Sequence, residues 1–154
     1  MGIKTCFISS TGGHLTQLRT IYDTFPQEES ALITEKNETT ISLGKHKNVS
    51  FLVQQDRKNI LFLFIFIINI ILSLVYVLKY RPQYIITTGA GSVIPFCIFG
   101  KIFGSNLIFI ESFAKVNTPT LTGRLLYKFA DKFYVQWEEL LSIYKNAEFK
   151  GRLY

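Results

Sequence analysis

The sequence predicts an α/β fold: a single Rossmann-like domain with a mostly parallel, doubly wound sheet of about six strands. The chain has 154 residues, enough for one core but not for two. Short runs rich in β-branched and aromatic residues alternate with longer segments of helical pattern, as in parallel α/β sheets. Two predicted strands run into glycine turns, SSTGGH at residues 9–14 and TTGAG at residues 87–91. We therefore expect residues 1–154 to form one domain.

Three strands are predicted in the first half of the chain, at residues 3–9, 30–34 and 49–53. The segment HLTQLRTIYDTF, residues 14–25, has helical spacing between the first two strands. A shorter connection, ETTISLG at residues 38–44, separates the second strand from the third. The longer connection suits a crossover between parallel strands.

A long apolar helix is predicted over about residues 58–80. Residues 60–78 carry no charge, and their helical length of about 28 Å nearly crosses a bilayer core. A spanning helix would separate the first three strands from the last three, so the single sheet argues against a span. Asn69, Ser73 and Tyr76 form only a thin polar stripe, which leaves more apolar surface than one sheet face can cover.

The surplus apolar surface of this helix predicts a second partner, and the membrane interface suits it. Basic residues bracket the run and can meet anionic headgroups: Arg57, Lys58, Lys79 and Arg81. The expected membrane contacts are Phe64, Ile68, Ile71, Lys58 and Lys79. Burial in the core or under another subunit, and a true span, remain alternatives.

The second half of the chain continues the alternation. Strands are predicted at residues 84–88, 106–111 and 132–136. Helical patterns follow them in SVIPFCIFGKIFG at residues 92–104, LTGRLLYKFA at 121–130 and WEELLSIYK at 137–145.

The composition indicates which binding partners and which cellular compartment to expect. The net charge of +6 suggests a nucleic acid, a phosphorylated substrate or a membrane surface. Cys6 and Cys97 lie in apolar surroundings without CxxC spacing, which predicts buried thiols in a reducing compartment. The first residues lack the pattern of a secretory signal, so a cytoplasmic domain is expected.

The two glycine turns form the candidate ligand site. In a doubly wound sheet, ligands bind outside the carboxyl ends of the strands where the strand order reverses, here between the first and fourth strands. Glycines there let backbone N–H groups approach an anion, and a helix N-terminus adds its dipole. The predicted phosphate-binding residues are Ser10, Thr11, Gly12, Gly13, Thr88, Gly89, Ala90, Gly91 and Ser92. Two tight strand-to-helix turns without a ligand are the alternative.

Two titratable residues near these turns are catalytic candidates. His14 follows the first glycine turn, and imidazole can act as a general base near neutral pH. Glu111 ends the strand NLIFIE at the same edge, an unfavourable place for a carboxylate unless it binds something. The alternatives are a helix-capping role for His14, and an N-cap or a salt bridge with Lys115 for Glu111.

Several familiar chemistries lack their motifs. The chain contains no GxxxxGK[ST], and STGGHL lacks the GxGxxG of dinucleotide-binding folds. Glu35, about twenty residues beyond the glycines, does mimic the ribose-binding acid of those folds, which keeps a dinucleotide-binding protein as a weaker alternative. His14 and His46 have no metal-ligand spacing, and the basic residues form no nucleic-acid motif. No cofactor, metal or nucleic acid is therefore expected.

Five segments together carry a resemblance that covers almost the whole chain: SSTGGHLTQL, ITTGAGSVIPF, IFIESFAKVNTPTLTGRLLY, ADKFYVQW and KGRLY. In these segments the chain resembles the acceptor-side subunit of the two-subunit N-acetylglucosaminyltransferase of asparagine-linked glycosylation. It looks closer still to bacterial relatives in capsule and exopolysaccharide gene clusters. More distantly it is similar to the N-terminal half of the peptidoglycan lipid-precursor N-acetylglucosaminyltransferase.

The resemblance implies half of a GT-B glycosyltransferase that docks on the membrane and binds a lipid-pyrophosphate-linked saccharide. A separate donor-binding subunit would bind most of the UDP-sugar and complete a heterodimer. His14 matches the histidine of the family's glycine loop, a candidate base for the acceptor hydroxyl, and Glu111 matches the acidic position after the fifth strand, near the same cleft; both are the expected catalytic residues. The two glycine turns match the loops expected to face the acceptor pyrophosphate. Trp137, Arg152 and Tyr154 are the expected partner contacts. The eukaryotic subunit's N-terminal anchor is not in this sequence, so we expect residues 60–78 to take the membrane role and the source to be prokaryotic.

The leading hypothesis is an inverting transfer of a sugar from UDP to the lipid-linked acceptor, at the cytoplasmic face of the cell membrane, by a peripheral or monotopic subunit. A non-catalytic membrane adaptor that stimulates a self-sufficient transferase is the main alternative.

Overall fold

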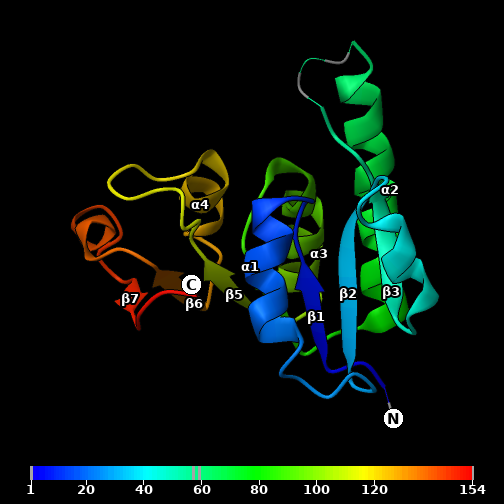
Figure 1. Cartoon of the computed structure of the whole chain (residues 1–154), viewed down its shortest axis with the longest axis horizontal. Coiled ribbons are helices and arrows are strands. Elements are labelled where there is room, and N and C mark those ends of the chain that lie inside the picture. Colours follow the sequence, from blue (N-terminus) through cyan, green and yellow to red (C-terminus); the bar gives the residue numbers. More distant parts are fainter. Residues whose placement is uncertain (1, 57, 59, 154) are drawn as a thin grey trace.

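A computed structural model describes residues 2–56, 58 and 60–153 of the chain. Seven parallel strands form one sheet in the order β3-β2-β1-β4-β5-β6-β7 (Figure 1). The strands are β1 (Thr5–Ile8), β2 (Ser30–Lys36), β3 (Val49–Val53), β4 (Tyr84–Thr87), β5 (Asn106–Ile110), β6 (Lys132–Val135) and β7 (Glu148–Phe149). The predicted parallel α/β sheet is therefore confirmed, with a two-residue seventh strand that the sequence pattern did not reveal.

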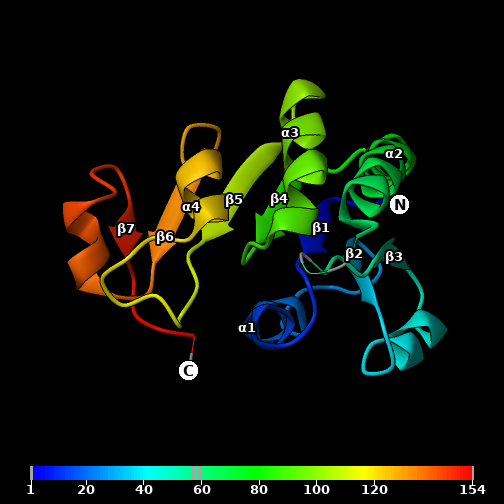
Figure 2. The same cartoon turned by 90° about the horizontal axis from the view of Figure 1, so that it is seen from above.

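Helices cover both faces of this sheet. Helix α1 lies on one face, while α2, α3 and α4 lie side by side on the other (Figure 2). The helices are α1 (Gly13–Tyr22), α2 (Phe62–Tyr80), α3 (Ile94–Ile102) and α4 (Leu121–Leu126). Three short 3₁₀ helices complete the connections: η1 (Ile41–Lys45), η2 (Gly91–Val93) and η3 (Glu138–Ser142).

The strand order reverses between β1 and β4, as predicted. β1 pairs with β2 on one side and with β4 on the other, so Ile8 lies between Ile33 and Thr87 at the carboxyl edge. Because β1 and β4 are neighbours and parallel, the two glycine turns that follow them emerge side by side at the same edge.

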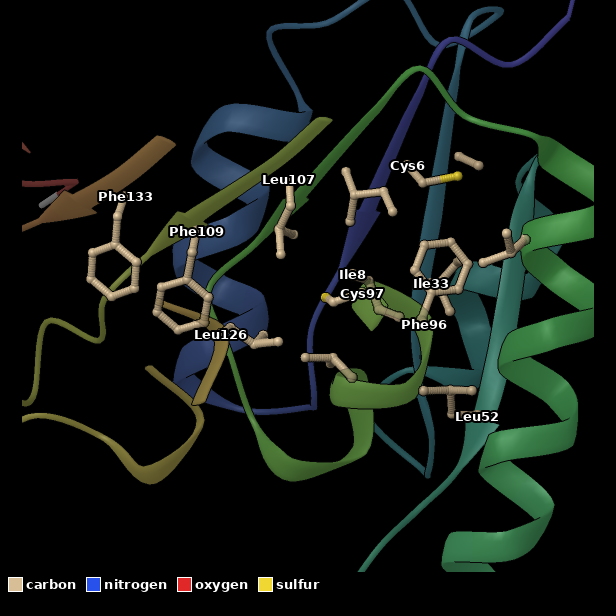
Figure 3. Close-up of a cluster of buried hydrophobic side chains, with 14 of the residues drawn as sticks. Cys6, Ile8, Ile33, Leu52, Phe96, Cys97, Leu107, Phe109, Leu126 and Phe133 are labelled. Atoms are coloured by element: carbon tan, nitrogen blue, oxygen red, sulfur yellow. The ribbon is translucent and has the colours of Figure 1, made fainter. Parts of the chain in front are cut away.

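The core lies mainly between the sheet and helices α2, α3 and α4. Figure 3 shows Ile8 and Ile33 of the sheet packed toward Phe96 of α3, with Leu107 and Phe109 beside Leu126. Cys6 and Cys97 are both buried free thiols in this cluster, as the sequence predicted. Desolvation by burial raises the pKa of each thiol, which keeps both protonated and unreactive.

Helix α2 packs its polar stripe inward and leaves its apolar surface outside. Asn69 is fully buried against β3, where its Nδ2 donates to the Val53 carbonyl oxygen at 2.9 Å and its Oδ1 accepts from the Val53 N–H at 2.8 Å. The Tyr76 hydroxyl donates to the Phe51 carbonyl oxygen at 2.8 Å. β3 is the edge strand of the sheet, so α2 satisfies backbone groups that a further strand would otherwise bind.

Candidate functional site

The two glycine turns at the switch point adopt conformations that ordinary residues avoid. Gly12 has a φ of 70° where α1 begins, and Gly89 has a φ of 95° at the end of β4. Ala90 has a φ of 110°, in a region that is open to glycine and strained for alanine by roughly 1–3 kcal/mol. Strain of this kind persists at ligand-binding turns, which makes the second loop a functional candidate.

His14 and Thr88 join the two turns through reciprocal hydrogen bonds. Thr88 is fully buried, and its Oγ1 donates to the His14 carbonyl oxygen at 2.8 Å. The imidazole Nδ1 lies 2.8 Å from the Thr88 carbonyl oxygen. A carbonyl oxygen only accepts, so we assign the imidazole proton to Nδ1, which leaves the Nε2 lone pair free in the neutral ring. That tautomer is the one a general base requires.

A cavity of about 660 Å³ opens beside these turns, at the carboxyl edge of the sheet. Its polar side is formed by residues of the predicted phosphate site: Ser10, Thr11, Ala90, Gly91 and Ser92. Phe62 and Phe66, from the first two turns of α2, line its apolar side. The structure thus brings both loops to one cavity and adds an aromatic wall that the sequence analysis had assigned only to the membrane helix.

The remaining residues of the predicted phosphate site flank this cavity without lining it. Gly12 borders a separate surface hollow of about 520 Å³ along α1, and Gly13 is exposed in the first turn of that helix. The Gly89 N–H donates to Thr87 Oγ1 at 3.0 Å, which uses one amide of the second loop inside the protein.

Glu35 lines the same cavity, although its position in the sequence suggested a ligand role only for the weaker dinucleotide-binding alternative. It lies in β2, is only 5% exposed, and lines the cavity together with Gln54 and Gln55. Desolvation raises the pKa of its carboxyl group, while the nearby Ser92 hydroxyl and the N–H groups of Gln55 and Thr11 oppose part of that rise. Its place at a strand end was visible in the sequence, but its neighbours come from other strands and from α2.

Glu111 is also at the carboxyl edge, but it lies inside the protein. Its side chain is fully buried, and it does not line the cavity between the glycine turns and α2. Its Oε1 accepts from the Ser112 N–H at 2.8 Å and from Thr120 Oγ1 at 2.9 Å. Its Oε2 accepts from the Tyr144 hydroxyl at 2.8 Å and from the Thr120 N–H at 3.2 Å. Because Thr120 caps the N-terminus of α4, this carboxylate connects β5, α4 and the segment after η3.

The predicted partner contacts lie at the far end of the sheet, near the C-terminus. The Trp137 indole donates to the Phe113 carbonyl oxygen at 2.7 Å, and the Arg152 guanidinium lies 3.9 Å from the centre of the indole ring. The Leu153 N–H donates to Gln136 Oε1 at 2.9 Å, which fixes this terminal segment to the end of β6. Tyr154 lies outside the described residues.

The apolar surface of α2 is exposed along its length. Phe62–Tyr80 is long and apolar enough to cross a membrane by length and composition, and only 17% of its most apolar window is buried. Phe64 is 62% exposed and Ile71 58%, whereas Ile68 is half-buried and Ile67, at 53%, is the more exposed neighbour. Burial of the whole helix in the chain's own core is therefore wrong. Lys58 and Lys79 are exposed near its two ends, and Arg57 lies outside the described residues.

Comparisons with known proteins identify relatives of this chain. UDP-N-acetylglucosamine transferase subunit alg14 of Schizosaccharomyces pombe is 39% identical over 75 residues, which cover 46% of this chain and 36% of the relative. The ALG14 subunit of Candida albicans is 38% identical over 93 residues, which cover 56% of this chain and 42% of the relative. The chain therefore aligns with less than half the length of either relative.

Two solved structures share the fold at low sequence identity. MurG from Acinetobacter baumannii matches 90% of this chain with 43% of its own length, at a TM-score of 0.70 and 12% identity. UDP-N-acetylglucosamine 2-epimerase from Rickettsia bellii matches 99% of this chain with 46% of its own length, at a TM-score of 0.71 and 12% identity. Such identities establish the fold alone, a Rossmann-like domain equivalent to about half of these larger proteins.

The profile of one protein family matches residues 53–153, which extend from the end of β3 to the C-terminal segment. Its description is "Oligosaccharide biosynthesis protein Alg14 like". Because the match covers well over half of the sequence, the chain belongs to the Alg14-like family.

Proposed function

We propose that this chain is the acceptor-binding, membrane-associated subunit of a two-component UDP-sugar glycosyltransferase. Its acceptor would be a lipid-pyrophosphate-linked saccharide of capsule or exopolysaccharide biosynthesis. The observation that carries the proposal is the pair of hydrogen bonds between His14 and Thr88, which we call the clip. The clip holds the two glycine loops together beside one cavity. The named transferase subunits among its relatives support the reaction class.

In the proposed reaction, a hydroxyl oxygen of the acceptor saccharide attacks the anomeric carbon of the UDP-sugar. The bond between that carbon and the UDP oxygen breaks, and UDP leaves with the electron pair. His14 Nε2 takes the hydroxyl proton as the new bond forms, since Nδ1 is committed to the Thr88 carbonyl oxygen. One displacement of this kind inverts the configuration of the anomeric carbon.

The glycine loops would hold the acceptor pyrophosphate. Gly13 begins α1, so unpaired N–H groups and the positive end of the helix dipole face the carboxyl edge. Glu111, which is fully buried and accepts hydrogen bonds from Ser112 and Thr120, would act as a positioning residue that fixes the loop before α4.

The membrane role rests on the position of α2. The helix stands beyond the carboxyl edge of the sheet at its N-terminal end (Figure 1), where Phe62 and Phe66 border the cavity and Leu63 and Phe64 are exposed. A helix at the membrane interface in this position would bring the headgroup region to the mouth of the cavity. The pyrophosphate of a membrane lipid lies in that region, so acceptor and site would meet without extraction of the lipid.

The proposal requires a donor-binding partner. We expect it to dock on the edge that carries both the cavity and the Trp137–Arg152 pair, because the donor must reach the acceptor hydroxyl. The test is co-expression with a donor-domain protein encoded nearby, followed by a UDP-sugar assay on lipid-linked acceptor. The complex should be active, with each chain alone nearly inactive. Full activity of this chain alone would refute the two-component arrangement, and full activity of the partner alone would favour the adaptor hypothesis.

A further inference from the structure

The cavity between the glycine loops and α2 has the wall chemistry of a carbohydrate site. Among the described residues that line it there is no lysine, arginine or histidine. Hydroxyl groups come from Ser10, Thr11 and Ser92, and side-chain amides come from Gln54 and Gln55. Such groups form hydrogen bonds with a neutral polyol, whereas a bare pyrophosphate would require cations or many backbone N–H groups.

Among the described residues of this lining, Glu35 is the one that carries a charge, and it is poorly satisfied within the protein. The Gln55 N–H donates to Glu35 Oε1 at a long 3.4 Å, and the Thr11 N–H is near enough to lower the pKa of the carboxyl group, but no described lysine or arginine pairs with it. The neighbouring Ser92 hydroxyl is 1% exposed and makes no hydrogen bond of good geometry. A buried carboxylate with so few partners destabilises the fold, so a ligand is the natural source of the missing hydrogen bonds.

We propose that Glu35 binds two adjacent hydroxyl groups of the sugar unit attached to the acceptor pyrophosphate. The inference rests on the proposed function. It assigns sugar binding to the cavity and pyrophosphate binding to the glycine loops. Each carboxylate oxygen accepts a hydrogen bond from one hydroxyl, and Ser92 supplies a further polar contact. Phe62 and Phe66, which line the same cavity, contact the apolar C–H surface of the sugar ring.

The negative charge of Glu35 also determines where the acceptor pyrophosphate can lie. Two anions in contact repel each other strongly in a partly desolvated cavity, so the phosphate groups lie outside it, on the backbone of the two loops. The sugar unit then lies between the pyrophosphate and the aromatic wall. Glu35 therefore selects for a glycosylated acceptor and against the unglycosylated lipid pyrophosphate.

The test compares two probes on the purified chain in detergent micelles. One is farnesyl pyrophosphate, and the other is farnesyl pyrophosphate that carries one glucose, galactose or N-acetylglucosamine. The wild-type chain should bind at least one glycosylated probe more tightly than the bare probe. Glu35→Gln should weaken binding of that probe about tenfold, because hydrogen bonds to a charged acceptor are the stronger ones. It should leave binding of the bare probe unchanged or tighter, because a negative charge has been removed.

Two further variants complete the design. Glu38→Gln makes the same chemical change at an exposed position two residues beyond β2, and it should alter neither affinity. Ser92→Ala removes the unpaired hydroxyl and should weaken only the glycosylated probe, by less than Glu35→Gln does. Ser92→Ala also tests the site independently of the buried charge.

Each other outcome has a distinct meaning. Equal losses on both probes would make Glu35 a structural residue and overturn the inference. The same variants are also titrated with UDP and with NAD, and a Glu35→Gln loss confined to either nucleotide would identify the diol as a ribose and overturn the inference. Wild-type binding of the glycosylated probe alone, dependent on Glu35, would support the sugar subsite and contradict the pyrophosphate role of the loops. Binding of neither probe would contradict both.

Discussion

His14 and Thr88 exchange two hydrogen bonds of 2.8 Å across the point where the strand order reverses. His14 lies in the first turn of α1 and Thr88 follows β4, so the two hydrogen bonds join residues 74 positions apart in the sequence. The clip fixes the orientation of the imidazole and holds the two loops at one spacing. The catalytic and binding roles proposed for this edge both depend on that geometry.

The base role of His14 can be separated from its clip role by substitution with asparagine. An asparagine side-chain amide can still donate to the Thr88 carbonyl oxygen, but it has no basic nitrogen at the Nε2 position. In the reconstituted complex, His14→Asn should lower kcat about 100-fold or more, the usual contribution of a general base, with little change in KM for the acceptor. His46→Asn, at the exposed second histidine, should behave as wild type. Normal turnover by His14→Asn would exclude the base assignment.

The polar stripe of α2 offers a paired stability test. Asn69→Ala removes both hydrogen bonds to Val53 and leaves two backbone groups of the edge strand unsatisfied, so it should lower the free energy of unfolding by about 2–3 kcal/mol. The buried Ser73 hydroxyl has no hydrogen-bond partner among the described residues. Ser73→Ala should therefore be neutral or stabilising. Urea unfolding measures the free energy of unfolding of both variants, provided that the m-value is unchanged. Equal destabilisation would contradict the role of Asn69 as the hydrogen-bond partner of the edge strand β3.

Tyr144 donates one of the hydrogen bonds that stabilise the buried carboxylate of Glu111. Burial of Tyr144, and then the Glu111 carboxylate, raise the pKa of the phenol, so it remains a hydrogen-bond donor at physiological pH. Tyr144→Phe removes a hydrogen bond to a charged group and should lower the free energy of unfolding by about 1.5–3 kcal/mol. Tyr84→Phe, at a residue 44% exposed, provides the matched control. If the two variants unfold at the same urea concentration, the Glu111 cluster is not a structural centre.

Membrane association is tested on the exposed face of α2. Replacing Phe64, Ile67 and Ile71 together with serine removes apolar surface that contributes about 1.5–3 kcal/mol per fully buried side chain. Co-flotation with vesicles that contain anionic lipid should then largely disappear, while urea stability should change little because all three residues are exposed. The control replaces Ile41, Val116 and Ile143, which are exposed outside α2. Unchanged flotation of the α2 variant would indicate that another subunit covers this face.

The strands and the switch point were predictable because their signals are local. Each strand of β1 to β6 is a short β-branched or aromatic run between turn residues, and the parallel order follows from the helical connections. The burial of Cys6 and Cys97 followed from the same runs.

The orientation of α2 was not predictable from its periodicity. Periodicity identifies residues that share one side of a helix, and Asn69, Ser73 and Tyr76 do share one side. It does not identify which side faces the protein. Here the polar side faces inward because β3 is an edge strand whose free backbone groups require donors and acceptors. Two apolar neighbours in this helix, Ile67 and Ile68, differ in exposure for the same reason.

The different environments of Glu35 and Glu111 were likewise not predictable from the sequence. Both were placed correctly at the carboxyl ends of strands. Thr120 and Tyr144, which surround Glu111, lie 9 and 33 residues away in the sequence, and only the folded chain brings them together. Glu35 is held less firmly, with a hydrogen bond of 3.4 Å from the Gln55 N–H, because its neighbours form the wall of a cavity.

The stability cost of Glu35 should depend on pH in a defined direction. Burial raises the pKa of this carboxyl group above its ordinary value of 4.5, so as pH rises from there the unfolded state loses the proton first. The folded state therefore loses stability as pH rises through that window, up to the folded-state pKa. Glu35→Gln removes the titration and should be more stable than wild type at pH 7.5, with a difference that narrows toward pH 4.5. Urea unfolding of both proteins across that range measures the difference. Glu38→Gln should show no such trend, and a glutamine variant less stable than wild type at pH 7.5 would mean that the carboxylate already has adequate partners within the protein.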